Sequence, residues 1–166
     1  MALNDIKVHD LGGLNSLPSR TYQVAASATL IYPGEPVAIE TAAGTPTVVK
    51  LADAQPVVSG LQVLGIASST STNTAAAAGT VDVSLAMPGQ VVWKAKAKTA
   101  STADTQAEID AKANDCIVLD LTGTSFTIDF AAVHANTNAI QVVGGNPDTT
   151  EIYFTFRPIV VEGAIA

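Results

Sequence analysis

The sequence predicts an all-β fold, either a sandwich or a small barrel. Val, Ile and Thr are abundant, and apolar residues alternate with polar ones over short runs, as expected for strands with one buried face. Turn-forming Gly, Pro, Asn and Asp residues interrupt these runs at short intervals. Short strands separated by frequent turns are typical of sandwiches and barrels.

The first 21 residues are predicted to form an extended arm that precedes a single β domain over 22–166. Residues 1–21 show no clear periodicity, and Leu11, Leu14 and Leu17 are too sparse to form a core of their own. The arm is either a frayed terminus, as most termini are, or a segment that becomes ordered against a neighbouring molecule. In the second case the three leucines help to offset the lost chain entropy.

Ten strands are predicted after the arm. Alternation is clearest at 80–85 and at 151–157, where Pro158 then marks an edge or a bend. The other predicted strands are 22–32, 35–40, 47–52, 57–66, 90–98, 116–121, 125–130 and 139–143. Turn residues lie between them at 33–34, 43–45, 88–89, 122–123 and 145–148.

One short helix is predicted as an insert in this β framework. Thr105 and Glu108 have the spacing of a capping box, in which each side chain bonds the backbone N–H of the other residue. Glu108 and Lys112 are spaced for an i,i+4 ion pair. Residues 113–115 then end the helix after about two turns, before the next strand.

A loop of small residues is predicted between two strands at 67–79. Every residue in it is Ala, Ser, Thr, Asn or Gly, and the chain has no ionisable side chain between Asp53 and Asp82. Long loops without internal structure are functional or disordered, and small side chains lose little entropy on ordering. We expect either a mobile tip or a contact with a neighbouring subunit, and we favour the contact.

The charge of the chain limits its partners. The net charge is −7 and charged residues make up 14% of the chain, against about 25% in typical domains. The acidic balance disfavours nucleic acid as a partner. So few charges give little protection against self-association, which predicts that part of the surface is buried against other chains.

Membrane and secretion signals are not expected either. The first ten residues mix charged and apolar side chains, unlike a signal peptide, and no apolar run approaches the roughly 18 residues of a membrane span. Cys116 is the single cysteine, so an internal disulfide is excluded and the side chain is expected to be a small buried apolar group.

No catalytic, cofactor-binding or metal-binding residues are predicted, and the chain is not expected to be an enzyme. Only His9 and His134 are present, without a Gly-x-Ser-x-Gly motif, a zinc-ligand pattern or a phosphate-binding loop. The densest acidic cluster lacks the pattern of a calcium loop and is read as a solvated helix face; its members are Asp104, Glu108, Asp110, Asp115 and Asp120.

Three lysines alternate along the predicted strand 90–98. They are Lys94, Lys96 and Lys98. Such a row either docks an acidic partner or keeps a strand edge from pairing with the wrong chain, and we favour the second interpretation.

The central block resembles the head decoration, or cement, proteins of tailed bacteriophages. It reads Tyr-Pro-Gly-Glu-Pro-Val-Ala-Ile from residue 32, Val-Leu-Gly-Ile-Ala from 63, and Ala-Gly-Thr-Val-Asp-Val-Ser-Leu from 78, followed by Pro88-Gly89 and Val91-Val92-Trp93. The resemblance spans roughly residues 30–98. It implies a small β-barrel or β-tulip domain, commonly a trimer, that binds the outside of a capsid, in several cases through an N-terminal arm.

The expected function is therefore that of a structural virion protein on the outer capsid surface, made in the host cytoplasm, which stabilises the shell by bridging major capsid protein subunits. The other expected partner is a second copy of the chain, in a homotrimer or a dimer, with no nucleic acid and no membrane. The predicted contacts lie in the arm and in the small-residue loop; they are Leu11, Leu14, Leu17, Pro18, Arg20, Thr70, Asn73, Thr74, Ala76 and Ala77.

Two alternatives stay open. The first is a carbohydrate- or receptor-binding β module of a phage tail or cell surface, although aromatic residues, which usually form such sites, make up only 5% of the chain. The second is a small hydrolase with an unrecognised site, which the two histidines disfavour.

Overall fold

The computed structural model describes residues 6–40, 47–51, 62–122, 125–135, 138 and 140–157. The all-β prediction is confirmed, with one short α-helix, α1 (Gln106–Ala111), and a 3-10 turn, η1 (Ala100–Thr102). The strands are β1 (Lys7–Asp10), β2 (Ser19–Val24), β3 (Pro36–Glu40), β4 (Thr47–Lys50), β5 (Gln62–Ala67), β6 (Gly79–Leu85), β7 (Val92–Lys96), β8 (Cys116–Ile117), β9 (Leu119–Thr122), β10 (Ser125–Ile128), β11 (Ile140–Asn146) and β12 (Glu151–Phe156). The predictions at 43–45, 57–61, 123, 139 and Pro158 lie outside the described residues.

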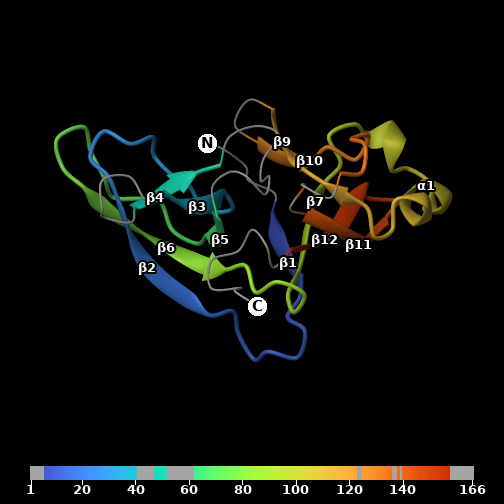
Figure 1. The fold of residues 1–166 in the computed structure, drawn as a ribbon, viewed down its shortest axis with the longest axis horizontal. Coiled ribbons are helices and arrows are strands. Elements are labelled where there is room, and N and C mark those ends of the chain that lie inside the picture. The colour runs from blue at the N-terminus through green and yellow to red at the C-terminus, as the bar shows by residue number, and fades with distance from the viewer. Residues whose placement is uncertain are drawn as a thin grey trace.

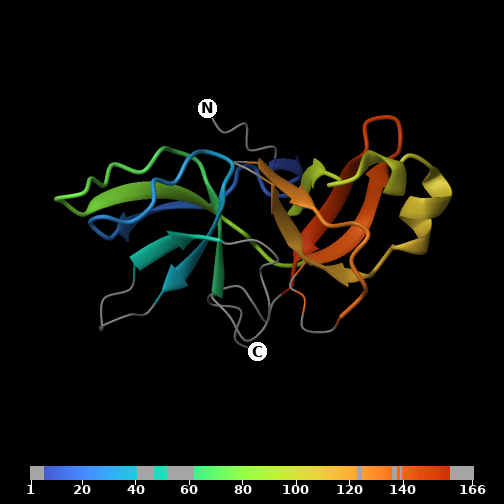
Figure 2. The same cartoon turned by 90° about the horizontal axis from the view of Figure 1, so that it is seen from above.

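The strands form two antiparallel sheets and a ribbon. The first sheet has the order β2-β6-β5-β3-β4, the second has the order β1-β7-β12-β11-β8, and β9 pairs with β10. Figures 1 and 2 show an elongated molecule with the first sheet at one end and the second sheet and α1 at the other. The chain crosses between the sheets after β1 and again after β6.

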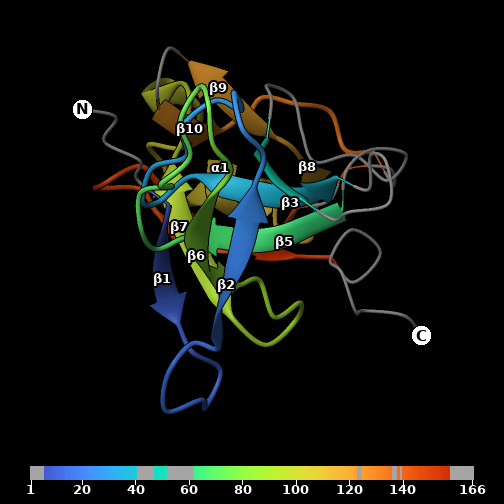
Figure 3. The ribbon, with the colours of Figure 1, turned by 90° about the vertical axis from the view of Figure 1, so that its left-hand side faces the viewer.

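The first sheet is strongly curled. Its edge strands β2 and β4 lie close together, and Figure 3 shows β2 and β6 running across β3 and β5. The inside of the curl is filled by apolar side chains that include Val24, Val37, Leu64 and Val81. Because β5 also presents Ile66 to the second sheet, the curled sheet has apolar residues on both of its faces.

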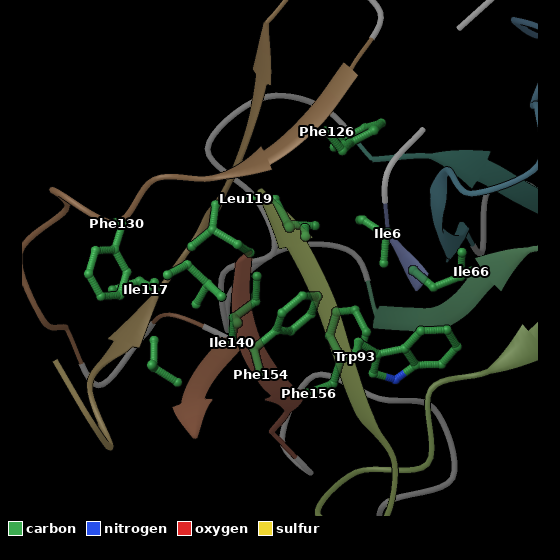
Figure 4. Close-up of a cluster of buried hydrophobic side chains, with 14 of the residues drawn as sticks. Ile6, Ile66, Trp93, Ile117, Leu119, Phe126, Phe130, Ile140, Phe154 and Phe156 are labelled. Carbon is green, nitrogen blue, oxygen red and sulfur yellow. The ribbon is translucent and has the colours of Figure 1, made fainter. Parts of the chain in front are cut away.

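A larger core joins the two sheets. Ile66 of β5 lies in the same buried cluster as Trp93, Phe154 and Phe156, and Figure 4 shows this group together with Ile6 and Phe126. Edge-to-face contacts order the aromatic rings, with centroids 6.4 Å apart for Trp93 and Phe156 and 5.6 Å apart for Phe154 and Phe156. The indole N–H of Trp93 donates to the carbonyl of Ala86 at 3.2 Å, so the buried polar atom is satisfied.

A buried ion pair ties the first sheet to the β9–β10 ribbon. The Glu35 carboxylate is fully buried, is paired with Lys50, and accepts a 2.9 Å bond from the Tyr32 N–H. The Lys50 ammonium also lies 5.6 Å from the ring centroid of Phe126 on β10, within the range of a cation–π contact.

The predicted arm contributes strands to both sheets. Residues 7–10 form β1 and pair with β7, while β2 begins at Ser19, before the expected domain boundary at residue 22. Leu14 and Leu17 pack against the larger core between the two sheets, which we call the joint core. Two of the three leucines that were too sparse to form a core of their own thus add to the core of the domain.

The helix begins as the sequence predicts but lacks the predicted ion pair. The capping box of Thr105 and Glu108 is present. The prediction of an ion pair between Glu108 and Lys112 was wrong. One carboxylate oxygen of Glu108 instead accepts hydrogen bonds from both the N–H and the hydroxyl of Thr105. Lys112 instead donates to the Ala132 carbonyl at 2.9 Å and lies 3.6 Å from Asp115.

Strand β7 is an interior strand, so its lysines do not protect a sheet edge. It pairs with β1 on one side and β12 on the other. Lys94 and Lys96 point away from the core, whereas Lys98 lies beyond the strand and pairs with Asp120. The interpretation of these lysines as edge protection was wrong.

Candidate functional site

The ten predicted contact residues fall into two groups at opposite ends of the β2–β6 ladder. Ser19 of β2 pairs with Ser84 at one end, next to the segment 11–18, and Val24 pairs with Gly79 at the other end, next to the loop 68–78. The arm and the loop therefore do not form one surface.

The arm group is partly used within the chain. Leu14 and Leu17 are half-buried against the joint core, and Leu11 and Pro18 are also half-buried. Arg20 is exposed on β2. Of the five arm residues, Arg20 alone is exposed.

The small-residue loop runs beside β6 and is bonded to it through hydroxyl groups. The Ser68 N–H donates to the Asp82 carbonyl at 2.8 Å, and the Asp82 N–H donates to the Ser69 hydroxyl at 2.9 Å. Further along, the Thr72 N–H bonds the Thr80 carbonyl and the Thr80 N–H bonds the Thr72 hydroxyl. Ser and Thr side chains here replace the backbone partners that a regular strand would supply.

The same loop is bonded to a second loop, residues 25–31. The N–H of Ser71 donates to the Ile31 carbonyl at 2.9 Å, and the Ser71 hydroxyl accepts from the Ile31 N–H at 3.0 Å. The Asn73 amide donates to the Ala28 carbonyl at 2.8 Å and accepts from the Ser71 hydroxyl at 2.7 Å. Ser71 and Asn73 are each only 5% exposed. The loop is thus bonded to its own chain, and Asn73, a predicted contact residue, lies inside.

The close fit of the two chain segments depends on Gly79. A Cβ atom at this position would lie 2.1 Å from the Asn73 nitrogen and 2.4 Å from the Thr72 carbonyl carbon. Both are backbone atoms, so the loop could not approach β6 this closely beside any other residue.

The two bonded loops form an exposed, uncharged surface, which we call the tip (residues 25–32 and 68–78). Residues 21–34 and 68–81 contain no Asp, Glu, Lys, Arg or His. Ala75 to Ala78 are exposed, as are Thr70 and Thr74. Leu30 and Tyr32 are 40% and 38% exposed, and they are two of the four exposed large apolar residues in the described part of the chain. The tip forms the end of the molecule opposite α1 (Figures 1 and 2).

Sequence reasoning missed one half of the tip. Residues 22–32 were predicted to be a single strand, but β2 ends at Val24 and 25–31 is the loop that bonds Ser71 and Asn73. The run Ala-Ala-Ser-Ala-Thr at 25–29 has the same small-residue composition as 68–78, and this shared composition is the signal that could have found it.

Groups with reactive chemistry are dispersed. The described ranges contain no group of three or more His, Cys, Asp or Glu side chains placed to hold a metal ion. His9 stacks on Tyr153, while His134 accepts a 3.0 Å bond at Nδ1 from the Cys116 N–H. The Cys116 side chain is buried, as predicted.

Comparisons with known proteins give no further identification. No protein-family model matches the chain, and no curated protein matches it. Over the residues that the structure describes, no helix is both long enough and apolar enough to cross a bilayer.

Proposed function

We propose that the protein is a structural virion protein that binds the outer surface of a phage capsid and stabilises the shell by bridging major capsid subunits, and that the tip is its contact with the shell. The observation that carries the proposal is the tip itself, an exposed surface without charge whose backbone is already held by internal hydrogen bonds. The resemblance of residues 30–98 to head decoration proteins is consistent with it.

The chemistry of the tip favours binding to another protein. Burying a charged group without a partner is costly, and the tip carries none. Leu30 and Tyr32 offer apolar area, and the side chains of Ala75 to Ala78 let a partner come close to the backbone. Because the loops are ordered before binding, association does not have to order them. Many copies around a shell then make modest single contacts act together.

The carbohydrate-binding alternative has less support. All eight aromatic residues lie in the described ranges, and Trp93 and the four Phe side chains are buried. Tyr22 packs against the core of the first sheet, and the Tyr153 ring is stacked on His9. Tyr32 alone among the aromatic residues is exposed, whereas sugar-binding surfaces usually need several aromatic faces.

The test is binding to undecorated shells of the phage that encodes the chain. We expect the purified protein to sediment with the shells and to raise the temperature at which they rupture. Replacing Ala75 and Ala77 by Glu places charge on the tip, and we expect at least a tenfold loss of affinity with unchanged unfolding of the free protein.

The matched control carries the same two Ala→Glu changes at Ala111 and Ala131, which are exposed at the other end of the molecule. This control should bind as the unmodified protein does. If the unmodified protein does not bind shells, the proposed function is wrong. If it binds and the tip variant binds equally well, the tip is not the contact.

A further inference from the structure

The outer face of the second sheet gathers positive charge in an acidic protein. The register places Lys7 of β1 beside Lys94 of β7, and Lys94 beside Tyr153 of β12. The next residues along each strand, Val8, Trp93 and Phe154, belong to the core. Because side chains alternate between the faces of a sheet, the lysines lie on the face that points away from the core. We call Lys7, His9, Lys94 and Lys96 the basic face; one acid, Glu151, lies opposite Lys96 on the same side of the sheet.

The basic face holds three of the eight Lys and Arg residues. Lys94 is paired with Glu151 at 3.1 Å, and Lys96 donates to the Thr149 carbonyl. Burial opposes ionisation of Glu151, but the hydrogen bond and charge of Lys94 and the charge of Lys96 outweigh it and lower its pKa. Lys7 forms no ion pair with another described residue, while two exposed acids lie nearby in the chain, Asp10 at the end of β1 and Asp148 in the turn between β11 and β12. By contrast, Lys50, Lys98 and Lys112 are each paired with a carboxylate elsewhere.

The basic face also carries a stacked pair of rings and an exposed apolar residue. The His9 ring stacks on the Tyr153 ring with centroids 3.7 Å apart and planes 12° apart. Tyr153 lies opposite Gly144 on β11, and a Cβ atom at Gly144 would come no closer than 3.9 Å to the Tyr153 ring. The neighbouring Val143 is 47% exposed. An outer sheet face that combines lysines with an exposed apolar residue suits a protein surface more than a small ligand, which needs a concave site.

Another copy of the chain offers a complementary acidic surface. Asp104 is exposed two residues before the short α1 helix and Asp110 is exposed in its last turn, with the half-exposed Glu108 between them. Among the described residues, neither Asp104 nor Asp110 forms an ion pair with a base of its own chain. The helix lies at the end of the molecule (Figure 1). A second copy of the chain can present these acids to the basic face, because both surfaces are exposed.

We propose that the basic face of one copy binds the α1 segment of a second copy, head to tail. This contact joins two different surfaces, so repetition closes a ring or extends a chain, depending on the rotation between copies. Because the attraction is between exposed charges, it weakens as salt shortens the screening length. The proposal concerns the purified chain and does not depend on the proposed capsid role.

A charge-exchange experiment tests the pairing. One variant carries K7E/K96E, which makes the basic face acidic, and the other carries D104K/D110K, which makes the α1 segment basic. Sedimentation velocity at low salt should show the unmodified protein associating, each variant alone at least tenfold weaker, and an equimolar mixture of the two associating again. The mixture recovers because the acidic face of the first variant meets the basic α1 segment of the second.

Control measurements separate this pairing from a general charge effect. R20E changes the net charge as much as K96E does, but Arg20 lies on the first sheet, so R20E should associate as the unmodified protein does while K96E is weakened. Circular dichroism and thermal unfolding check that each variant folds. If K7E/K96E does not fold, the same mixing experiment is done with the single variants K96E and D110K. Unmodified protein that stays monomeric at low salt, or a mixture that does not recover, would overturn the proposal.

Discussion

Replacing Asn73 by Ala should destabilise the protein through the interior of the tip. Asn73 is buried, and its side-chain amide bonds the Ala28 carbonyl at 2.8 Å and the Ser71 hydroxyl at 2.7 Å. A neutral hydrogen bond contributes about 0.5–1.5 kcal/mol net, and a buried group left without a partner costs about 1–3 kcal/mol. We therefore expect N73A to lower the free energy of unfolding by about 1–3 kcal/mol, measured by urea denaturation with an unchanged slope.

The matched control is the same substitution at Asn15, which is exposed in the segment between β1 and β2. We expect N15A to change the free energy of unfolding by less than about 0.5 kcal/mol, as surface substitutions usually do. If N73A and N15A have equal effects, the hydrogen bonds of Asn73 do not hold the tip, and the tip is not ordered in the way described above.

Three further predictions test other parts of the fold. G79A should destabilise strongly because its Cβ would meet backbone atoms of the loop, whereas G144A, whose Cβ meets only the Tyr153 ring at 3.9 Å, should be nearly neutral in thermal unfolding. K50M should cost about 3–5 kcal/mol in urea denaturation because it leaves the buried Glu35 carboxylate without its partner, and E35L/K50M should recover most of that loss. The Thr105 hydroxyl lowers the pKa of Glu108, so this contribution to stability is present above the unfolded pKa and is lost as pH falls through the folded pKa. NMR titration should show the Glu108 pKa rising in T105A, and an unchanged value would contradict the capping role.

Features that depend on neighbouring residues were predictable from the sequence. The capping box of Thr105 and Glu108 needs only a spacing of three, and the alternation at 80–85 and 151–157 marks β6 and β12 directly. Cys116 was expected to be buried because it begins an apolar run, and it is.

Features that depend on distant partners were not predictable. β2 ends at Val24, where its partner β6 begins at Gly79, and the small residues at 25–29 do not by themselves fix the residue at which the pairing stops. The lysines of β7 look like edge protection until β1, from the other end of the sequence, is found beside them. Residues 68–78 look featureless because part of their order comes from Ser27, Ala28 and Ile31, which lie 40 to 48 residues earlier in the chain.

Site-specific crosslinking tests the proposed contact between tip and shell most directly. The single native cysteine, Cys116, is buried, so a photocrosslinker can be attached to A76C on the tip or to A111C on α1, both of which are exposed positions. With undecorated shells, we predict that the probe at residue 76 crosslinks to the major capsid protein and the probe at residue 111 does not. Shells that bind the protein but crosslink only from residue 111, or equally from both, would contradict the account.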